Sequence, residues 1–131
     1  MNSRTYILLG DPVPLARARM SPYRVYDSQK QIKLVAGINL RNQHNDEPLL
    51  QGPLLLDVTF TLAMPRSWSR KKQGELVGSS HIFKPDLSNL LKFVEDIATG
   101  IIYNDDCIIA QVMAKKVYGP EPSTKFTLTQ L

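Results

Sequence analysis

The chain has 131 residues, which fits one folded domain spanning 1–131 and leaves little room for a second. Hydrophobic residues make up 43% of it, enough to form a core and to exclude a wholly disordered chain. No run of about 18 uncharged apolar residues occurs, so we expect no membrane span, and the apolar stretch at 6–9 is too short for a signal peptide. Because Cys107 has no second cysteine to pair with, the expected location is the reducing cytoplasm.

The formal net charge is +4, and the distribution of charge is more informative than its sum. Basic residues gather in three groups: Arg17, Arg19 and Arg24; Arg66, Arg70, Lys71 and Lys72; Lys115 and Lys116. Acidic residues concentrate at Asp86, Glu95, Asp96, Asp105 and Asp106. A metal-dependent nuclease needs basic groups that bind phosphate around carboxylates that hold a cation. A solvated surface of mixed charge is the alternative interpretation.

The first half of the chain predicts two short strands and one helix. Residues 5–9 form an apolar strand, and the prolines at 12 and 14 prevent a regular helix directly after it. Residues 23–26 form a second short strand. Ser28 is the predicted N-cap of a helix that reaches about Gln43, with Gly37 weakening its middle.

The middle of the chain holds the clearest strand, at 54–64. Apolar residues alternate there with more polar ones, which gives one buried face and one wetter face. Pro65 ends this strand. Ser67 or Ser69 then caps a short basic helix that runs to about Leu76, and residues 77–85 form a loop.

The best-patterned helix follows this loop. Its apolar side chains recur at spacings of three and four, at Leu87, Leu90, Leu91, Val94, Ile97 and Ala98. Gly100 is a natural residue to follow the helix end. An extended piece at 101–103, a turn at 104–106 and strands at 108–118 and 125–131 complete a mixed α+β domain.

Asp86 stands at the start of this helix, where it is either an N-cap or a metal ligand. Asp105 and Asp106 follow the same helix. A helix of about thirteen residues runs roughly 20 Å, so Asp86 and Asp106 meet only if the returning chain brings them together. If they do, a few hard carboxylate oxygens suit Mg²⁺. Lys92 then neutralises charge on a phosphate, or is an ordinary surface lysine.

Three further residues have two interpretations each. His81 contacts phosphate or is structural, with the structural role favoured. Trp68 belongs to a DNA-contacting helix or anchors that helix to the core. Cys107 is expected to be a small buried apolar residue.

Three stretches of the chain resemble one family. Residues 84–92, Lys-Pro-Asp-Leu-Ser-Asn-Leu-Leu-Lys, followed by Gly100 and by Tyr-Asn-Asp-Asp at 103–106, resemble the signature of RusA-type Holliday-junction resolvases. Pro-Val-Pro at 12–14 with Arg17 and Arg19, and the stretch 64–72, are similar to phage-borne members. The resemblance implies an α+β fold with a small mixed sheet packed with two to three helices. It also implies a homodimer, encoded by a bacterium or prophage.

The resemblance implies an endonuclease that resolves four-way DNA junctions by paired nicks in recombination and repair, with Mg²⁺, or Mn²⁺ in its place. Asp86 and Asp106 would be essential carboxylates and metal ligands, Asp105 a further ligand, Lys92 the catalytic lysine, and Asp96 a helix-borne acid. The residues expected to contact DNA are Arg17, Arg19, Arg70, Lys71, Lys72 and Lys84.

Ser88 departs from the family, which commonly has aspartate at this position. Ser88 ligates weakly or through water, or Asp105, Asp57 or Asp96 supplies the missing carboxylate, or the protein binds junctions without cutting them. We favour an active or once-active nuclease over a non-catalytic junction-binding homologue. A structural or regulatory phage protein with no nucleic-acid role is the third hypothesis.

Overall fold

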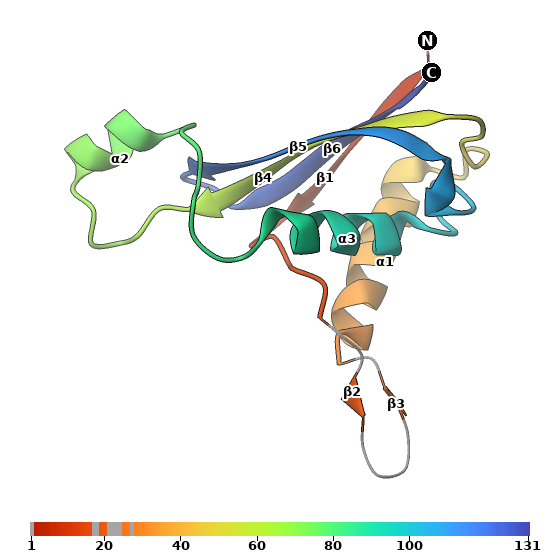
Figure 1. Cartoon of the computed structure of the whole chain (residues 1–131), viewed down its shortest axis with the longest axis horizontal. Coiled ribbons are helices and arrows are strands. Elements are labelled where there is room, and N and C mark those ends of the chain that lie inside the picture. Colours follow the sequence, from red (N-terminus) through yellow and green to blue (C-terminus); the bar gives the residue numbers. More distant parts are fainter. Residues whose placement is uncertain (1, 17–18, 21–24, 27) are drawn as a thin grey trace.

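A computed structural model describes residues 2–16, 19–20, 25–26 and 28–131. Figure 1 shows a twisted sheet with α1 and α3 on one of its faces, and α2 beyond one end of the sheet. The N- and C-terminal ends of the chain lie side by side, because the first and last strands are paired. The α+β fold, with a mixed sheet and three helices, confirms the fold class predicted from the sequence.

The sheet has four strands in the order β1-β6-β4-β5. They are β1 Ser3–Leu9, β6 Ser123–Gln130, β4 Leu54–Ala63 and β5 Ile109–Gly119. β6 is antiparallel to both β1 and β4, whereas β4 and β5 are parallel. Parallel neighbours need a long crossover connection. The segment with α2 and α3 is that crossover, so α3 runs back along the sheet from the end of β4 toward the start of β5 (Figure 1).

The remaining elements are α1 Lys30–His44, α2 Arg70–Leu76, α3 Leu87–Ala98, the 3₁₀ turn η1 Asp106–Ile108, and a small hairpin of β2 Arg19–Met20 with β3 Val25–Tyr26. Most predicted elements are confirmed within one or two residues. Two details are wrong: Gln29 rather than Ser28 is the N-cap residue of α1, and residues 101–102 turn instead of extending, while Tyr103 forms isolated β-bridges with Leu50 and Thr99. Residues 23–24 of the second predicted strand lie outside the described residues.

The core lies between the sheet and α3. Leu54, Leu56, Val58 and Phe60 alternate along β4 and are all buried. The predicted apolar stripe of α3 packs against these side chains, and Phe93 adds to it. The buried residues of α3 are Leu90, Phe93, Val94, Ile97 and Ala98. The other face of the sheet is polar, as shown by hydroxyl pairs between β1 and β6 such as Thr5 with Thr127, at 2.8 Å.

A buried hydrogen bond fastens the end of α1 to β1. His44 is 4% exposed, and its Nδ1 lies 2.7 Å from the Tyr6 hydroxyl, while its Nε2 lies 3.1 Å from the carbonyl of Pro48. A carbonyl only accepts, so Nε2 carries the proton and Nδ1 accepts from the tyrosine. Burial, which outweighs the opposing effect of Arg4, raises the pKa of Tyr6 and keeps this donor protonated.

The Tyr6→Phe variant should therefore lose stability. It leaves the buried Nδ1 of His44 without a donor, which costs about 1–3 kcal/mol. Urea denaturation measures this loss, and Thr5→Val, which breaks only an exposed hydroxyl pair on the same strand, is the control. Equal loss of stability in the two variants would contradict this role for the Tyr6–His44 bond.

Candidate active site

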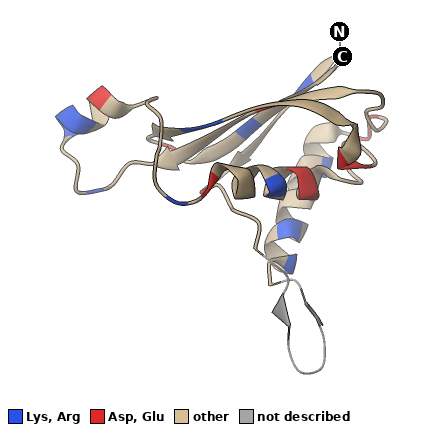
Figure 2. Ribbon diagram, viewed as in Figure 1, with Lys and Arg blue, Asp and Glu red and all other residues tan. Residues whose placement is uncertain are grey.

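Four carboxylates gather where α3 ends and η1 begins; we call Glu95, Asp96, Asp105 and Asp106 the acidic cluster. Figure 2 shows acidic segments at the end of α3 and in the turn before β5. The turn is held against the helix by Tyr103, whose hydroxyl donates to the carbonyl of Glu95 at 2.8 Å. The amide of Gly100 donates to the Tyr103 carbonyl at 2.7 Å, and Gly100 has a φ of +83°, as expected for a residue just after a helix.

The carboxylates of the cluster disfavour one another's ionisation. Burial and then the charge of Asp106 raise the pKa of Glu95, while Lys92 acts in the opposite direction. Burial, a hydrogen bond with Asp105 and the charges of Asp105 and Asp96 raise the pKa of Asp106. A bound cation would favour the ionised form of both. The arrangement therefore has the electrostatics of a site that gains from positive charge.

Asp105 is the exception in this cluster. Its Oδ1 accepts from the backbone N–H of Cys107 at 2.9 Å, and hydrogen bonds from Cys107 lower its pKa. Cys107 is exposed, so the expectation that it is buried is wrong. The cause is η1, which interrupts the strand just before β5 and turns this residue outward. Hydrogen bonding to Asp105, followed by burial and the two aspartate charges, raises the pKa of the thiol.

Asp86 occupies the N-cap position of α3, but its carboxylate accepts no hydrogen bond from the first turn. It lies instead 3.1 Å from the ammonium of Lys84. The predicted capping position is thus correct, whereas the side chain does not perform the capping role. The carboxylate is half-exposed and faces a groove.

That groove brings together two of the motifs read from the sequence. It is lined by residues of the proline-rich segment, of β4 and of the start of α3: Asp11, Pro12, Pro14, Leu62, Lys84, Pro85, Asp86 and Asn89. The amide of Leu15 donates to the carbonyl of Asn89 at 2.9 Å, which fixes the proline-rich segment against the first turn of α3. Arg17 lies outside the described residues, and so does the side chain of Arg19.

The two acidic regions lie at opposite ends of α3. Asp86 precedes α3 and Glu95 is nine residues further along, which is about 13 Å at 1.5 Å per residue. Within one chain Asp86 and Asp106 therefore do not meet. Asp57 does not join either region, because its side chain lies on the opposite, uncovered face of the sheet, beside Thr127 and Met113.

The polar face of α3 connects the two ends. Ser88, Lys92 and Glu95 follow one another at spacings of four and three, which places them in one row along the helix. Asp106 lies beside the last of them. The chain therefore gathers Lys92, Glu95 and Asp106. Glu95 was missed as a functional residue, although its spacing from Ser88 and Lys92 carries the signal.

The donor set fits a hydrated cation and not a closed protein cage. Among the described residues, no three or more of His, Cys, Asp and Glu are grouped so as to hold a metal. Mg²⁺, however, keeps several waters and usually takes only one or two carboxylates. Glu95 and Asp106 supply that number, and burial followed by neighbouring acidic groups raises the pKa of both carboxyls despite the opposing charge of Lys92 on Glu95.

The basic helix α2 projects beyond the end of the sheet (Figure 2). Arg70, Lys71 and Lys72 are exposed on it, and Ser69 caps it by accepting from the amide of Lys72 at 3.1 Å. Trp68 packs on Tyr118 with ring centroids 5.0 Å apart, which confirms the anchoring interpretation of this residue.

The loop from α2 to α3 is anchored to the end of β5. The His81 ring packs on Tyr118 at 4.8 Å, and burial and then the charge of Lys116 lower the pKa of His81. This packing is the structural role favoured for His81. The ammonium of Lys116 donates to the carbonyls of Phe83 at 2.7 Å and Pro85 at 2.8 Å. Sequence spacing gives no sign of these bonds, because their acceptors are backbone atoms.

Comparison with known proteins defines the class. Residues 10–129 match the family described as Endodeoxyribonuclease RusA, so the chain belongs to the RusA endodeoxyribonuclease family. Membership implies a junction-resolving endodeoxyribonuclease. The chain is also similar to Uncharacterized protein YqaN of Bacillus subtilis (strain 168), with 26% identity over 145 positions that cover all of this chain and 99% of that protein. Among the described residues, no helix has the length and apolar character needed to cross a bilayer.

Replacing Asp86 by alanine should change stability little. A lost N-cap hydrogen bond costs about 1 kcal/mol, but the carboxylate of Asp86 makes none. We expect the free energy of unfolding to change by less than about 0.5 kcal/mol in urea denaturation, with Tyr6→Phe as the destabilised reference. A loss of about 1 kcal/mol or more would assign Asp86 a capping role.

Proposed function

We propose that the protein is a Mg²⁺-dependent endonuclease that resolves four-way DNA junctions by paired nicks, with Mn²⁺ able to replace Mg²⁺. The observation that carries this proposal is the grouping of Lys92, Glu95 and Asp106 at one end of α3 in a chain of the RusA family. Two carboxylates and a lysine are the groups that phosphodiester hydrolysis with a bound metal requires. We also propose the bacterial cytoplasm as the place of action.

Each residue has a distinct proposed role. Asp106 and Glu95 hold the cation, with Asp105, whose lowered pKa keeps it ionised, as a further acidic group. When bound, the metal polarises the phosphodiester and lowers the pKa of a water. The ammonium of Lys92 neutralises charge on the scissile phosphate. Lys92 is exposed on the polar face of α3, where a DNA backbone can reach it.

Asp86 is predicted to be an essential carboxylate, but within one chain it does not lie near the acidic cluster. It lies at the opposite end of α3 from the acidic cluster, beside Lys84 and the groove of the proline-rich segment. We propose that the homodimer, rather than the single chain, assembles the full acidic set. Exposed Lys84 and the residues of α2, Arg70, Lys71 and Lys72, bind phosphates, so junction affinity falls as salt rises. Arg17 and Arg19 remain predicted DNA contacts.

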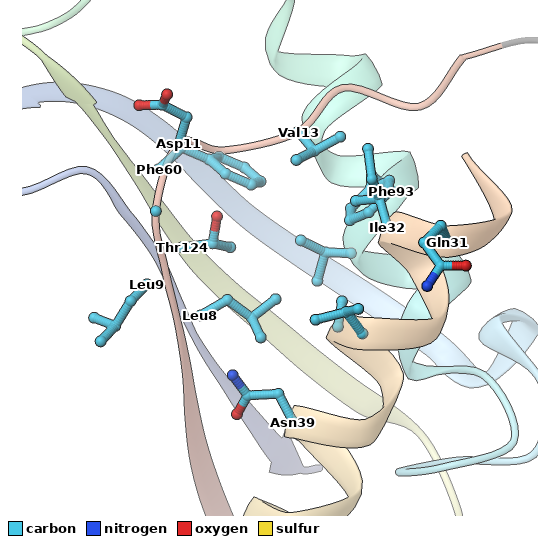
Figure 3. A pocket seen from close by; sticks show the side chains of 14 residues that line it. Leu8, Leu9, Asp11, Val13, Gln31, Ile32, Asn39, Phe60, Phe93 and Thr124 are labelled. Carbon is cyan, nitrogen blue, oxygen red and sulfur yellow. The ribbon is translucent and has the colours of Figure 1, made fainter. Parts of the chain in front are cut away.

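The exposed face of α1 supports a homodimer. Ile32, Leu34, Val35 and Ile38 are each about half exposed, between 48% and 60%, and form one apolar strip. Figure 3 shows the hollow of about 330 Å³ on one side of this strip, between α1, β1 and α3. A second hollow of about 320 Å³ lies on its other side, against Ile97 and Ile101 of the α3 end. An apolar strip between two hollows suits a self-complementary contact with a second copy.

One observation favours a non-catalytic junction-binding homologue as the second candidate. Ser88 is exposed on the first turn of α3, and no group of three potential metal ligands occurs among the described residues. A serine hydroxyl is a poorer Mg²⁺ ligand than a carboxylate. In that case Ser88→Asp should create or raise nuclease activity.

Cleavage of a synthetic four-way junction tests the proposed activity. We expect Mg²⁺-dependent, symmetrical nicking that Asp86→Asn and Asp106→Asn abolish. Glu95→Gln should slow it by about 10²-fold, the order of effect seen when one group that stabilises a transition state electrostatically is removed. Asp57→Asn is the control, since its carboxylate lies on the other face of the sheet.

The opposite outcome is also defined. If the wild type binds junctions but leaves them intact across Mg²⁺ and Mn²⁺, and Ser88→Asp cuts them, the second candidate replaces the first. Absence of salt-sensitive junction binding in a gel shift would support a protein without a nucleic-acid role.

The homodimer is tested by replacing one residue of the apolar strip. Val35→Asp places a charge at a position that is 60% exposed in the single chain, so it should fold normally but prevent dimerisation. Analytical ultracentrifugation measures the mass, and Asn42→Asp, also exposed on α1 but outside the strip, is the control. A monomeric wild type, or a dimer that Val35→Asp leaves intact, would rule out this contact.

A further inference from the structure

Lys116 holds the segment that leads into α3. It lies on β5 in register with Phe60 of β4, and its ammonium donates to the carbonyls of Phe83 and Pro85 at 2.7 and 2.8 Å. These two carbonyls lie on either side of Lys84, and the second belongs to the residue directly before Asp86. Hydrogen bonds from a charged donor are roughly twice as strong as neutral ones.

The segment has little else to hold it. Its anchor on the N-terminal side is the His81 amide, which donates to the carbonyl of Lys116 at 3.0 Å. Beyond it the side chains of Ile82 and Phe83 are 79% and 63% exposed. Within the described part of the chain, the other polar contact that joins residues 82–85 to the rest is the ion pair of Lys84 with Asp86, at 3.1 Å, which holds side chains and not the backbone. Among the described residues, the Lys116 side chain is therefore the one that holds the backbone carbonyls of this segment.

We propose that Lys116 is a positioning residue for Asp86. By fixing the carbonyls at 83 and 85, it sets where the backbone enters the first turn of α3 and directs the Asp86 carboxylate to the groove. A lysine suits this task because its ammonium has three donors and no acceptor, so it satisfies two carbonyls at once. It is not a catalytic residue, since it contacts only the backbone. Its effect on cleavage rests on the proposed nuclease function.

The neighbouring lysine provides a matched comparison. Lys115 carries the same charge, but it alternates to the other face of β5, in register with Thr59, and is exposed. Lys115→Met and Lys116→Met remove the same charge from adjacent positions of one strand. Only the second removes the donors to residues 83 and 85, so a difference between the variants reports the hydrogen bonds and not the charge.

Hydrogen exchange of the free protein is the first measurement. Lys116→Met should speed amide exchange in the peptide covering 82–91 by about tenfold, whereas Lys115→Met should leave it as in the wild type. Exchange in β4 and α1 reports whether the fold is intact. Equal protection of 82–91 in both variants would overturn the proposal, whatever the protein does to DNA.

Junction cleavage is the second measurement. We expect Lys116→Met to lower kcat by about 10–100-fold, with KM for the junction changed no more than by Lys115→Met, because misplacing a reacting group affects the chemical step. Lys116→Arg should recover much of the rate, since a guanidinium can also donate to two carbonyls. Equal rates for the two methionine variants would overturn the proposal. A wild type that does not cut would end the proposed function, while hydrogen exchange still decides whether Lys116 holds the segment.

Discussion

The parallel pairing of β4 with β5 is the constraint on which the rest of the structure depends. Two consecutive parallel strands cannot be joined by a tight turn, so the chain must cross the sheet before β5 begins. α3 makes this crossing, and its apolar stripe packs over the buried side of β4. As a consequence its first residue lies at the end of β4, and its last residue lies at the start of β5. The distance between the acidic regions of this chain follows directly from that topology.

In the acidic cluster, the fold holds carboxylates that repel one another close together. Tyr103 and Gly100 turn the chain back on α3 so tightly that Asp106 arrives beside Glu95, where each carboxylate is harder to ionise than in water. Lys33 of α1 offsets part of this charge, because its ammonium lies 3.0 Å from Asp96. Lys92 offsets another part. A cluster whose negative charge is only partly neutralised by its own chain has the electrostatics expected of a site that binds a cation, or a ligand held by that cation.

Much of the fold could be predicted from the sequence because it depends on local periodicity. Three such features can be read from short stretches of sequence: the apolar stripe of α3, the alternation in β4 and the Ser69 cap. The features that escaped prediction depend on contacts between distant residues. The Tyr6–His44 hydrogen bond and the bonds from Lys116 to residues 83 and 85 span 38 and about 30 positions and leave no spacing to detect. The exposure of Cys107 was missed because this residue lies in a 3₁₀ turn that precedes β5, and not in the strand itself.

The roles of the predicted site residues stay predictions, and the structure shows how these residues are grouped. The sequence led to Asp86, Lys92 and Asp106, and the structure places only the last two near each other, with Glu95 between them. This grouping bears on Ser88, which stands where the family commonly has an aspartate. Ser88 and Glu95 lie in the same row on α3, two turns apart, with Lys92 between them. Ser88 stands at the first position of this row and Glu95 at its end, next to Asp106, so the carboxylate of this row lies toward the start of β5.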